Sequence, residues 1–151
     1  MTLSIRRAAV ADAAVVTEFN RLLALETEHK RLDPAVLHAG VVAGLSDPEK
    51  ALYFVAEEAG EVLGQLMLTR EWSDWRNGWI WWIQSVYVRQ DARRKGVFRA
   101  LYWHVHESAK ADPGVIGIRL YMERDNAAAE KTYVGLGMSH TSYVVLERYP
   151  L

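Results

Sequence analysis

The hydrophobic pattern switches repeatedly between a two-residue and a 3.6-residue period. Short alternating or continuous apolar runs predict strands, and longer runs with apolar residues three or four positions apart predict helices. The predicted strands are Leu3–Arg7, Leu52–Glu57, Val62–Leu68, Trp79–Val88, Ile116–Met122 and Ser142–Leu146. The predicted helices are Ala11–Glu28, Pro34 to about Leu45, Val97–Lys110 and Ala127–Leu136.

The order of these elements predicts the fold class. Its first half favours antiparallel hairpins, and its later alternation of strand and helix favours parallel crossovers. We therefore expect an α/β protein with a mixed sheet of about six to seven strands and helices on both faces. At 151 residues the chain is long enough for one domain with a proper core, and no linker or repeat divides residues 1–151.

Turn and cap residues support the predicted boundaries. Asp33 before Pro34 is typical of a helix N-terminus, and Asn126 is a second candidate N-cap. Gly137 fits the position after a helix C-terminus. Asn77-Gly78 is a strong turn signal between two strands.

Charge and cysteine content narrow the function classes. The formal net charge of −1 argues against a general nucleic-acid binder, which needs a surplus of Lys and Arg. The chain has no cysteine, which excludes thiolate metal sites and an acyl-cysteine intermediate and fits a reducing cytoplasm. No apolar run reaches the length of a membrane span. No metal site is expected.

A cationic turn links one apolar strand to the following helix. The strand ends at Val86-Tyr87-Val88, and the turn contains Arg93, Arg94, Lys95 and Gly96, followed by Val97, Phe98 and Arg99. The first N–H groups of a helix have no internal partner, and glycine lets an anion approach the backbone closely. A diphosphate cradle and a solvated basic helix start are both compatible with this turn. No Walker or G-x-G-x-x-G pattern is present, which disfavours ATP and NAD.

A second motif, later in the chain, helps to interpret the cationic turn. Asn126, Ala129, Tyr133 and Gly137 follow the pattern N-x-x-A-x-x-x-Y-x-x-x-G, and Arg93-x-x-Gly96-x-Phe98 precedes it. Together the two motifs resemble those of the GNAT superfamily of acyl-CoA-dependent N-acyltransferases, over roughly residues 85–138. The family usually has Gly or Ala where this chain has Phe98, so the Phe98 ring is expected to turn away from the phosphates.

The resemblance implies acetyl-CoA as cosubstrate and a role for each motif residue. Backbone groups of Val86 and Val88, on either side of Tyr87, would pair with the pantetheine amides. Residues 93–99 would hold the diphosphate, and Asn126 would hydrogen-bond the pantetheine arm. Tyr133 would act as general acid toward the departing CoA thiolate.

The general base and the acceptor site are less defined. Trp79–Val88 carries no carboxylate, so Glu71 and Glu123 are the candidates for a base, each with a solvated or structural role as the alternative. Strand alternation predicts Trp79, Trp81 and Tyr87 on one face and Trp82 and Gln84 on the other. Trp72, Trp75, Trp82 and Gln84 are the candidate acceptor-site residues, with core packing as the alternative for any tryptophan. The aromatic hairpin would also suit a homodimer contact.

These observations predict an N-acetyltransferase that acts on a small-molecule or peptide amine by direct attack. An amine needs no enzyme nucleophile against a thioester, only proton removal and a stabilised leaving group. Two alternatives remain at this point. One is a module that binds acyl-CoA without turnover, and the other is a phosphate- or nucleotide-binding domain unrelated to CoA.

Overall fold

The structure, a computed structural model, describes residues 2–151, which divide into two compact units at residue 120: residues 2–120 and residues 121–151. The strands are β1 (Ser4–Arg7), β2 (Leu52–Glu58), β3 (Glu61–Ser73), β4 (Gly78–Val88) and β5 (Val115–Arg119). The helices are α1 (Ala13–Glu28), α2 (Pro34–Ser46), α3 (Val97–Ala111) and α4 (Ala127–Gly135). The expectation of one domain over residues 1–151 stays a prediction.

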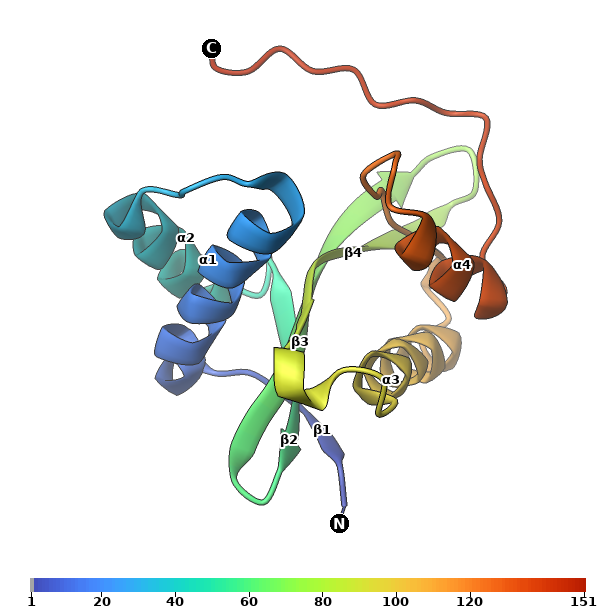
Figure 1. The fold of residues 1–151 in the computed structure, drawn as a ribbon. Coiled ribbons are helices and arrows are strands. Elements are labelled where there is room, and N and C mark those ends of the chain that lie inside the picture. The colour runs from blue at the N-terminus through green and yellow to red at the C-terminus, as the bar shows by residue number, and fades with distance from the viewer. Residues whose placement is uncertain (1) are drawn as a thin grey trace. The chain divides into compact units, whose positions relative to one another are not determined.

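The first unit contains a five-stranded mixed sheet between two helical layers. The strand order is β1-β2-β3-β4-β5, antiparallel throughout except for the parallel pair β4–β5. Helices α1 and α2 lie on one face of this sheet, and α3 lies on the other (Figure 1). The predicted mixed sheet with helices on both faces is confirmed.

The strand count is lower than predicted. Residues 142–146, expected to form a last strand, adopt no regular structure, and the described sheet has five strands instead of six to seven. Their β-branched and aromatic composition favours a strand, but a strand also needs a neighbour with which to exchange backbone hydrogen bonds. Within their own unit, residues 121–151, the structure describes no strand that could be that neighbour.

A polar side chain fixes the start of α2, whereas a 3-10 turn precedes α1. The Asp33 carboxylate accepts hydrogen bonds from the backbone N–H groups of Ala35 (2.9 Å) and Val36 (3.1 Å), with Pro34 in the first turn, as predicted. Helix α1 is preceded by a 3-10 turn at Val10–Asp12, so it starts two residues later than the predicted Ala11.

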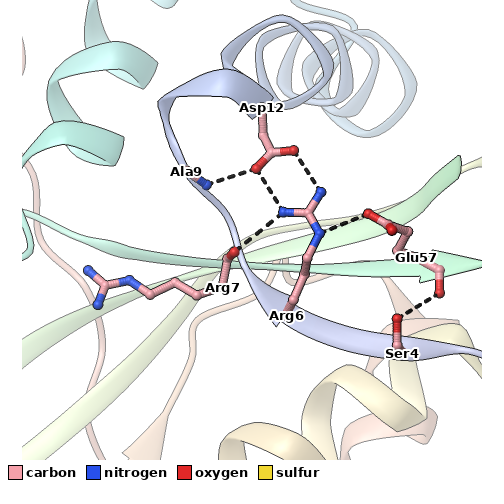
Figure 2. Close-up of polar contacts among 6 residues, drawn as sticks. All are labelled: Ser4, Arg6, Arg7, Ala9, Asp12 and Glu57. Atoms are coloured by element: carbon pink, nitrogen blue, oxygen red, sulfur yellow. Dashed lines mark hydrogen bonds and ion pairs between the residues drawn. The ribbon is translucent and has the colours of Figure 1, made fainter. Parts of the chain in front are cut away.

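A partly exposed ion-pair network ties β1 to the start of α1 (Figure 2). The Arg6 guanidinium donates two hydrogen bonds of 2.9 Å to Asp12, and its Nε donates to Glu57 of β2 at 2.8 Å. Asp12 also accepts from the Ala9 N–H at 2.8 Å. The Arg6 hydrogen bonds lower the pKa of the Asp12 carboxyl, because they stabilise its charged form.

Two close approaches position helices against the sheet. A Cβ on Gly44 of α2 would lie 3.0 Å from the Tyr53 ring of β2. A Cβ on Gly64 of β3 would lie 2.9 Å from Cγ1 of Val97, the first residue of α3. Glycine at position 64 therefore lets the N-terminus of α3 sit directly on the strand next to β4.

A β-bulge in β4 changes which residues share a face. Gln65 pairs with Tyr87 and Met67 pairs with Gln84, so two residues, Ser85 and Val86, oppose one residue of β3. Ser85 has a positive φ of 52°, and its carbonyl accepts a 3.0 Å hydrogen bond from the fully buried Gln65 side chain.

The bulge corrects the predicted alternation of β4. Directly paired residues point to the same face of a sheet. Tyr87 therefore lies on the face of Trp82 and Gln84, toward α1 and α2, whereas Trp79 and Trp81 lie on the α3 face. The grouping of Tyr87 with Trp79 and Trp81 was wrong because one extra residue reverses the alternation beyond Ser85.

Candidate active site

The end of β4 has an open edge. Strand β5 pairs with β4 only from Trp79 to Trp82, while β4 continues to Val88. The N–H of Arg89 donates to Leu63 of β3 at 2.8 Å. Because ladder residues alternate in direction, the backbone polar groups of Val86 and Val88 point away from β3, as pairing with an added strand requires.

The turn after β4 leads into a helix N-terminus that has no side-chain cap. Arg94 (φ 62°) and Gly96 (φ 83°) both have left-handed backbone conformations, and α3 begins at Val97. Gly96 is the N-cap residue and has no side chain with which to cap the helix, and the first intrahelical bond runs from Ala100 N–H to the Gly96 carbonyl. Because the first N–H groups of a helix have no intrahelical acceptor, the N-terminus of α3 suits an anion.

The predicted cationic side chains of this turn form two groups, one with partners in the protein and one without. Arg93 donates from Nε to the Val88 carbonyl (2.9 Å) and pairs with Glu26 of α1, while Lys95 donates to the Asp91 carbonyl (3.0 Å). The side chains of Arg94 and Arg99 are exposed and have no hydrogen bond or ion pair with any of residues 2–151. The positive charge available to a ligand therefore comes first from Arg94 and Arg99.

Glu26 joins α1 to the cationic turn. Its carboxylate accepts a 2.6 Å hydrogen bond from the Tyr87 hydroxyl and a 2.5 Å bond from Arg93, whose guanidinium lies 5.4 Å from the Tyr87 ring centroid. The Tyr87 hydrogen bond, followed by that of Arg93, lowers the pKa of the Glu26 carboxyl. Burial and the bond to Glu26 raise the pKa of Tyr87 to about 12.

The raised pKa of Tyr87 predicts an alkaline stability loss. A group with a raised folded-state pKa stabilises the fold fully below its ordinary pKa near 10, and loses that contribution as the pH approaches 12. Between these values, the wild type should lose about 2–3 kcal/mol of unfolding free energy relative to Tyr87→Phe. Urea unfolding of both proteins across this pH range measures the difference, and parallel profiles would contradict the assignment.

Phe98 lies along α3. Its ring is half-buried, with its centroid 6.3 Å from that of Tyr102, one helical turn further on. The neighbouring Val97 is the residue that enters the core, where it is 4 % exposed.

The second unit contains the other predicted motif. Asn126 caps α4 by accepting a hydrogen bond from the Ala129 N–H at 3.1 Å. Tyr133 is half-buried, and this burial raises the pKa of its hydroxyl. Gly137 (φ 99°) follows the helix, and Met138 N–H bonds back to the Tyr133 carbonyl at 3.1 Å, so the predicted helix end is confirmed.

The two candidate bases have different surroundings. Glu71 of β3 accepts hydrogen bonds from Trp82 Nε1 (2.8 Å) and Arg119 (3.4 Å), on the face that also contains Gln84. Glu123 accepts from the Asp125 N–H at 2.8 Å and thereby shapes the turn before α4. Glu71 thus belongs to a polar cluster on the sheet, and Glu123 to a local turn.

The candidate acceptor residues do not form one group. Trp82 and Gln84 lie on the α1–α2 face, where Gln84 donates to Thr69. Trp72 lies on the α3 face against Trp79, with ring centroids 5.0 Å apart. Trp75, in the turn between β3 and β4, is 86 % exposed. Only Trp82 and Gln84 are near the Glu71 cluster.

Sequence reasoning did not identify two features of the site. Ser85, the bulge residue, was visible as a polar interruption with Gln84 in an apolar run, but this signal does not specify a bulge. Glu26 was visible only as one position on a helical stripe. Residues 2–151 contain no group of three or more metal-ligating side chains, and none of their helices has the length and apolarity of a bilayer crossing.

Comparison with known proteins identifies the family. Residues 15–138 match the acetyltransferase (GNAT) family, so the chain belongs to the GNAT acetyltransferases and is an acyltransferase. No curated protein matches it closely.

Solved structures agree with this assignment. A possible acetyltransferase from Clostridium difficile 630 is 42 % identical, with a TM-score of 0.94 and alignment over 100 % of this chain and 99 % of that one. A ribosomal-protein-alanine N-acetyltransferase from Brucella melitensis biovar Abortus 2308 is 17 % identical, with a TM-score of 0.81 over 99 % and 100 %. An aminoglycoside acetyltransferase from an uncultured soil sample is 19 % identical, with a TM-score of 0.72 over 100 % and 99 %. The last two comparisons show the fold alone.

Proposed function

We propose that the protein transfers an acetyl group from acetyl-CoA to a primary amine. The observation that carries the proposal is the junction of β4 and α3. There an open strand edge at Val86–Val88 leads into a turn with a bare helix N-terminus at Gly96 and two unpaired arginines, Arg94 and Arg99.

The residues of this junction fit acetyl-CoA. The pantetheine arm contains two amides, which suit the open backbone groups of Val86 and Val88. A diphosphate suits the helix N–H groups and the Arg94 and Arg99 side chains. A Cβ on Gly96 would meet no atom within 4 Å, so the space beside the backbone is open to a ligand. The Val88 carbonyl already accepts a hydrogen bond from Arg93, so the nearest pantetheine amide would share this carbonyl with Arg93.

The proposed reaction is direct attack of the amine on the thioester carbonyl. The attacking nitrogen must lose a proton, and Glu71, beside Trp82 and Gln84, is the carboxylate that we assign to this step, directly or through water. The departing thiolate must gain a proton, which we assign to Tyr133. The Tyr133 hydroxyl, whose pKa burial raises above its ordinary value, is protonated at neutral pH, as a general acid requires.

A protein that binds acyl-CoA without turnover is the second candidate. It is favoured by the lack of a carboxylate on β4 and by the engagement of Glu71 with Trp82 and Arg119. Thiol release from acetyl-CoA, measured across a panel of small amines and peptides, separates the two functions. Amine-dependent release supports the transferase, whereas tight acetyl-CoA binding without release for any amine supports the sensor.

The two unpaired arginines should dominate diphosphate binding. The variant Arg94→Ala/Arg99→Ala should weaken acetyl-CoA binding by about tenfold for each arginine, since each removes a charge-assisted contact of about 1.4 kcal/mol. Calorimetric titration with acetyl-CoA and with CoA lacking the acetyl group measures the loss. Both ligands should lose affinity equally, because both carry the diphosphate.

A matched variant controls for net charge. Arg21→Ala/Lys50→Ala also removes two exposed cations, but these are paired with Glu18 and Asp47, in α1 and the turn after α2. Its affinity for acetyl-CoA should equal that of the wild type. Equal affinity losses in both double variants would point to general charge and contradict the specific role of Arg94 and Arg99.

A further inference from the structure

Arg93 lies beside the open edge of β4, apart from the two arginines that we assign to the diphosphate. Its Nε donates to the Val88 carbonyl at 2.9 Å. That carbonyl points away from β3, toward the edge where the pantetheine arm is proposed to pair. Because a hydrogen bond holds its donor close to the acceptor, the Arg93 guanidinium lies next to the path of this arm.

The Arg93 guanidinium has more donors than its contacts in the protein use. A guanidinium carries five N–H groups. Within residues 2–151, Arg93 donates to the Val88 carbonyl and the Glu26 carboxylate and lies close to the Tyr87 hydroxyl. Its side chain is 40 % exposed. Arg93 can therefore donate to a ligand while it keeps these contacts.

Glu26 fixes the position of this guanidinium from α1. One oxygen of its carboxylate pairs with Arg93, and the other accepts the 2.6 Å hydrogen bond from the Tyr87 hydroxyl. Tyr87 is 5 % exposed and packs against Phe19 of α1, with ring centroids 5.1 Å apart. A flexible arginine that is already held in place loses less conformational entropy when it binds a ligand.

We propose that Arg93 binds the pantetheine arm and that Glu26 is its positioning residue. The inference rests on acetyl-CoA as the ligand of this junction. Between the diphosphate and its first amide N–H, the arm carries a hydroxyl and a carbonyl oxygen. Val88 is the β4 residue nearest the cationic turn, so these two oxygens would lie beside Arg93, which donates to them. The diphosphate is left to the N-terminus of α3 with Arg94 and Arg99.

Two ligands that are parts of CoA test this division of the site. Pantetheine has the arm without the diphosphate, and ADP has the diphosphate without the arm. The double variant Glu26→Gln/Arg93→Gln should lower pantetheine affinity by about tenfold, as expected for the loss of a hydrogen bond from a charged donor. It should leave ADP affinity unchanged, because the substitutions keep the net charge. Arg94→Ala/Arg99→Ala should weaken ADP binding and leave pantetheine affinity unchanged. Calorimetric titration measures both affinities.

A second ion pair on the same helix provides the matched control. Glu18 and Arg21 of α1 are 2.7 Å apart, and Glu18→Gln/Arg21→Gln also keeps the net charge. This variant should bind both ligands with wild-type affinity. Wild-type pantetheine affinity in Glu26→Gln/Arg93→Gln would overturn the proposal. The side chains of Glu26 and Arg93 are 36 % and 40 % exposed, so the variants should fold, which far-UV circular dichroism checks.

The single variant Glu26→Gln separates positioning from a purely structural role. Its amide oxygen can still accept from Arg93, but the bond is weaker and the Arg93 charge is no longer neutralised. Pantetheine affinity should fall by about threefold, because the donor to the arm is held less firmly. ADP affinity should rise by about threefold, because an unneutralised cation then lies near the diphosphate site. A disturbed turn would instead weaken the binding of both ligands, and that result would overturn the positioning role of Glu26.

This inference and the proposed function fail in different ways. If the wild type binds CoA and pantetheine but releases no thiol with any amine, the transferase function is wrong, and the affinities still test Arg93 and Glu26. If amine-dependent thiol release occurs but Glu26→Gln/Arg93→Gln binds pantetheine like the wild type, the transferase function is supported and this inference is wrong. A wild type that does not bind CoA would overturn both.

Discussion

Replacement of Tyr133 by Phe should lower the turnover number by roughly 10²–10⁴-fold and leave acetyl-CoA affinity nearly unchanged. The hydroxyl that the substitution removes is the proposed proton donor to the CoA thiolate. It is protonated at neutral pH, and burial raises its pKa further above neutrality. The ring, which contributes the packing, stays. Steady-state thiol release gives the turnover number, and calorimetry gives the affinity.

A second tyrosine in the same unit provides the control. Tyr149 is 84 % exposed, and Tyr149→Phe should retain wild-type turnover. If Tyr133→Phe also turns over at the wild-type rate, water or another side chain protonates the thiolate, and Tyr133 is not the acid. A loss of acetyl-CoA affinity equal to the loss of kcat/KM would instead make Tyr133 a binding residue.

Replacement of Gly96 by Val should weaken acetyl-CoA binding by about tenfold or more, the equivalent of about 1.4 kcal/mol. Its φ of 83° lies in the left-handed region, which β-branched residues strongly disfavour. The side chain would also occupy the space beside the N–H groups that we assign to the diphosphate. Isothermal titration with acetyl-CoA measures the change.

The control variant Gly60→Val separates the effect of backbone strain from steric blockage of the acetyl-CoA site. It lies in the turn between β2 and β3 with φ 79°, and a Cβ there also meets no atom within 4 Å. Gly60→Val should therefore lower thermal stability about as much as Gly96→Val while leaving acetyl-CoA affinity unchanged. If Gly96→Val binds acetyl-CoA with wild-type affinity, residues 93–99 are not the diphosphate site.

The elements that the sequence predicted best have strong local causes. Asp33-Pro34 starts α2 because side-chain and backbone chemistry at that point favours a helix start whatever packs around it. The same holds for Gly137 after α4 and for the apolar period of α3. The cationic turn was predictable because its glycine and arginines lie within seven consecutive residues.

The features that escaped prediction depend on residues far apart in the chain. The Tyr87–Glu26 hydrogen bond joins residues 61 positions apart, and no local pattern specifies such a pairing. A separate ion pair between Arg93 and Glu26 removes Arg93 from the available cations, which the sequence alone had counted together. Residues 142–146 show the opposite problem, because their local preference for a strand is strong but no pairing partner follows from it.

In the β4 bulge, the number of residues between Gln84 and Tyr87 affects the site more than the identity of those residues. Two residues separate Gln84 from Tyr87, where a regular ladder would have one. Their number determines both that Tyr87 reaches Glu26 and that Val86 and Val88 turn their backbone groups to the open edge. Substitutions at Ser85 or Val86 change one contact each, whereas an insertion or deletion of one residue would invert both outcomes together. Over evolutionary time, this segment should accept amino-acid changes and reject changes in residue count.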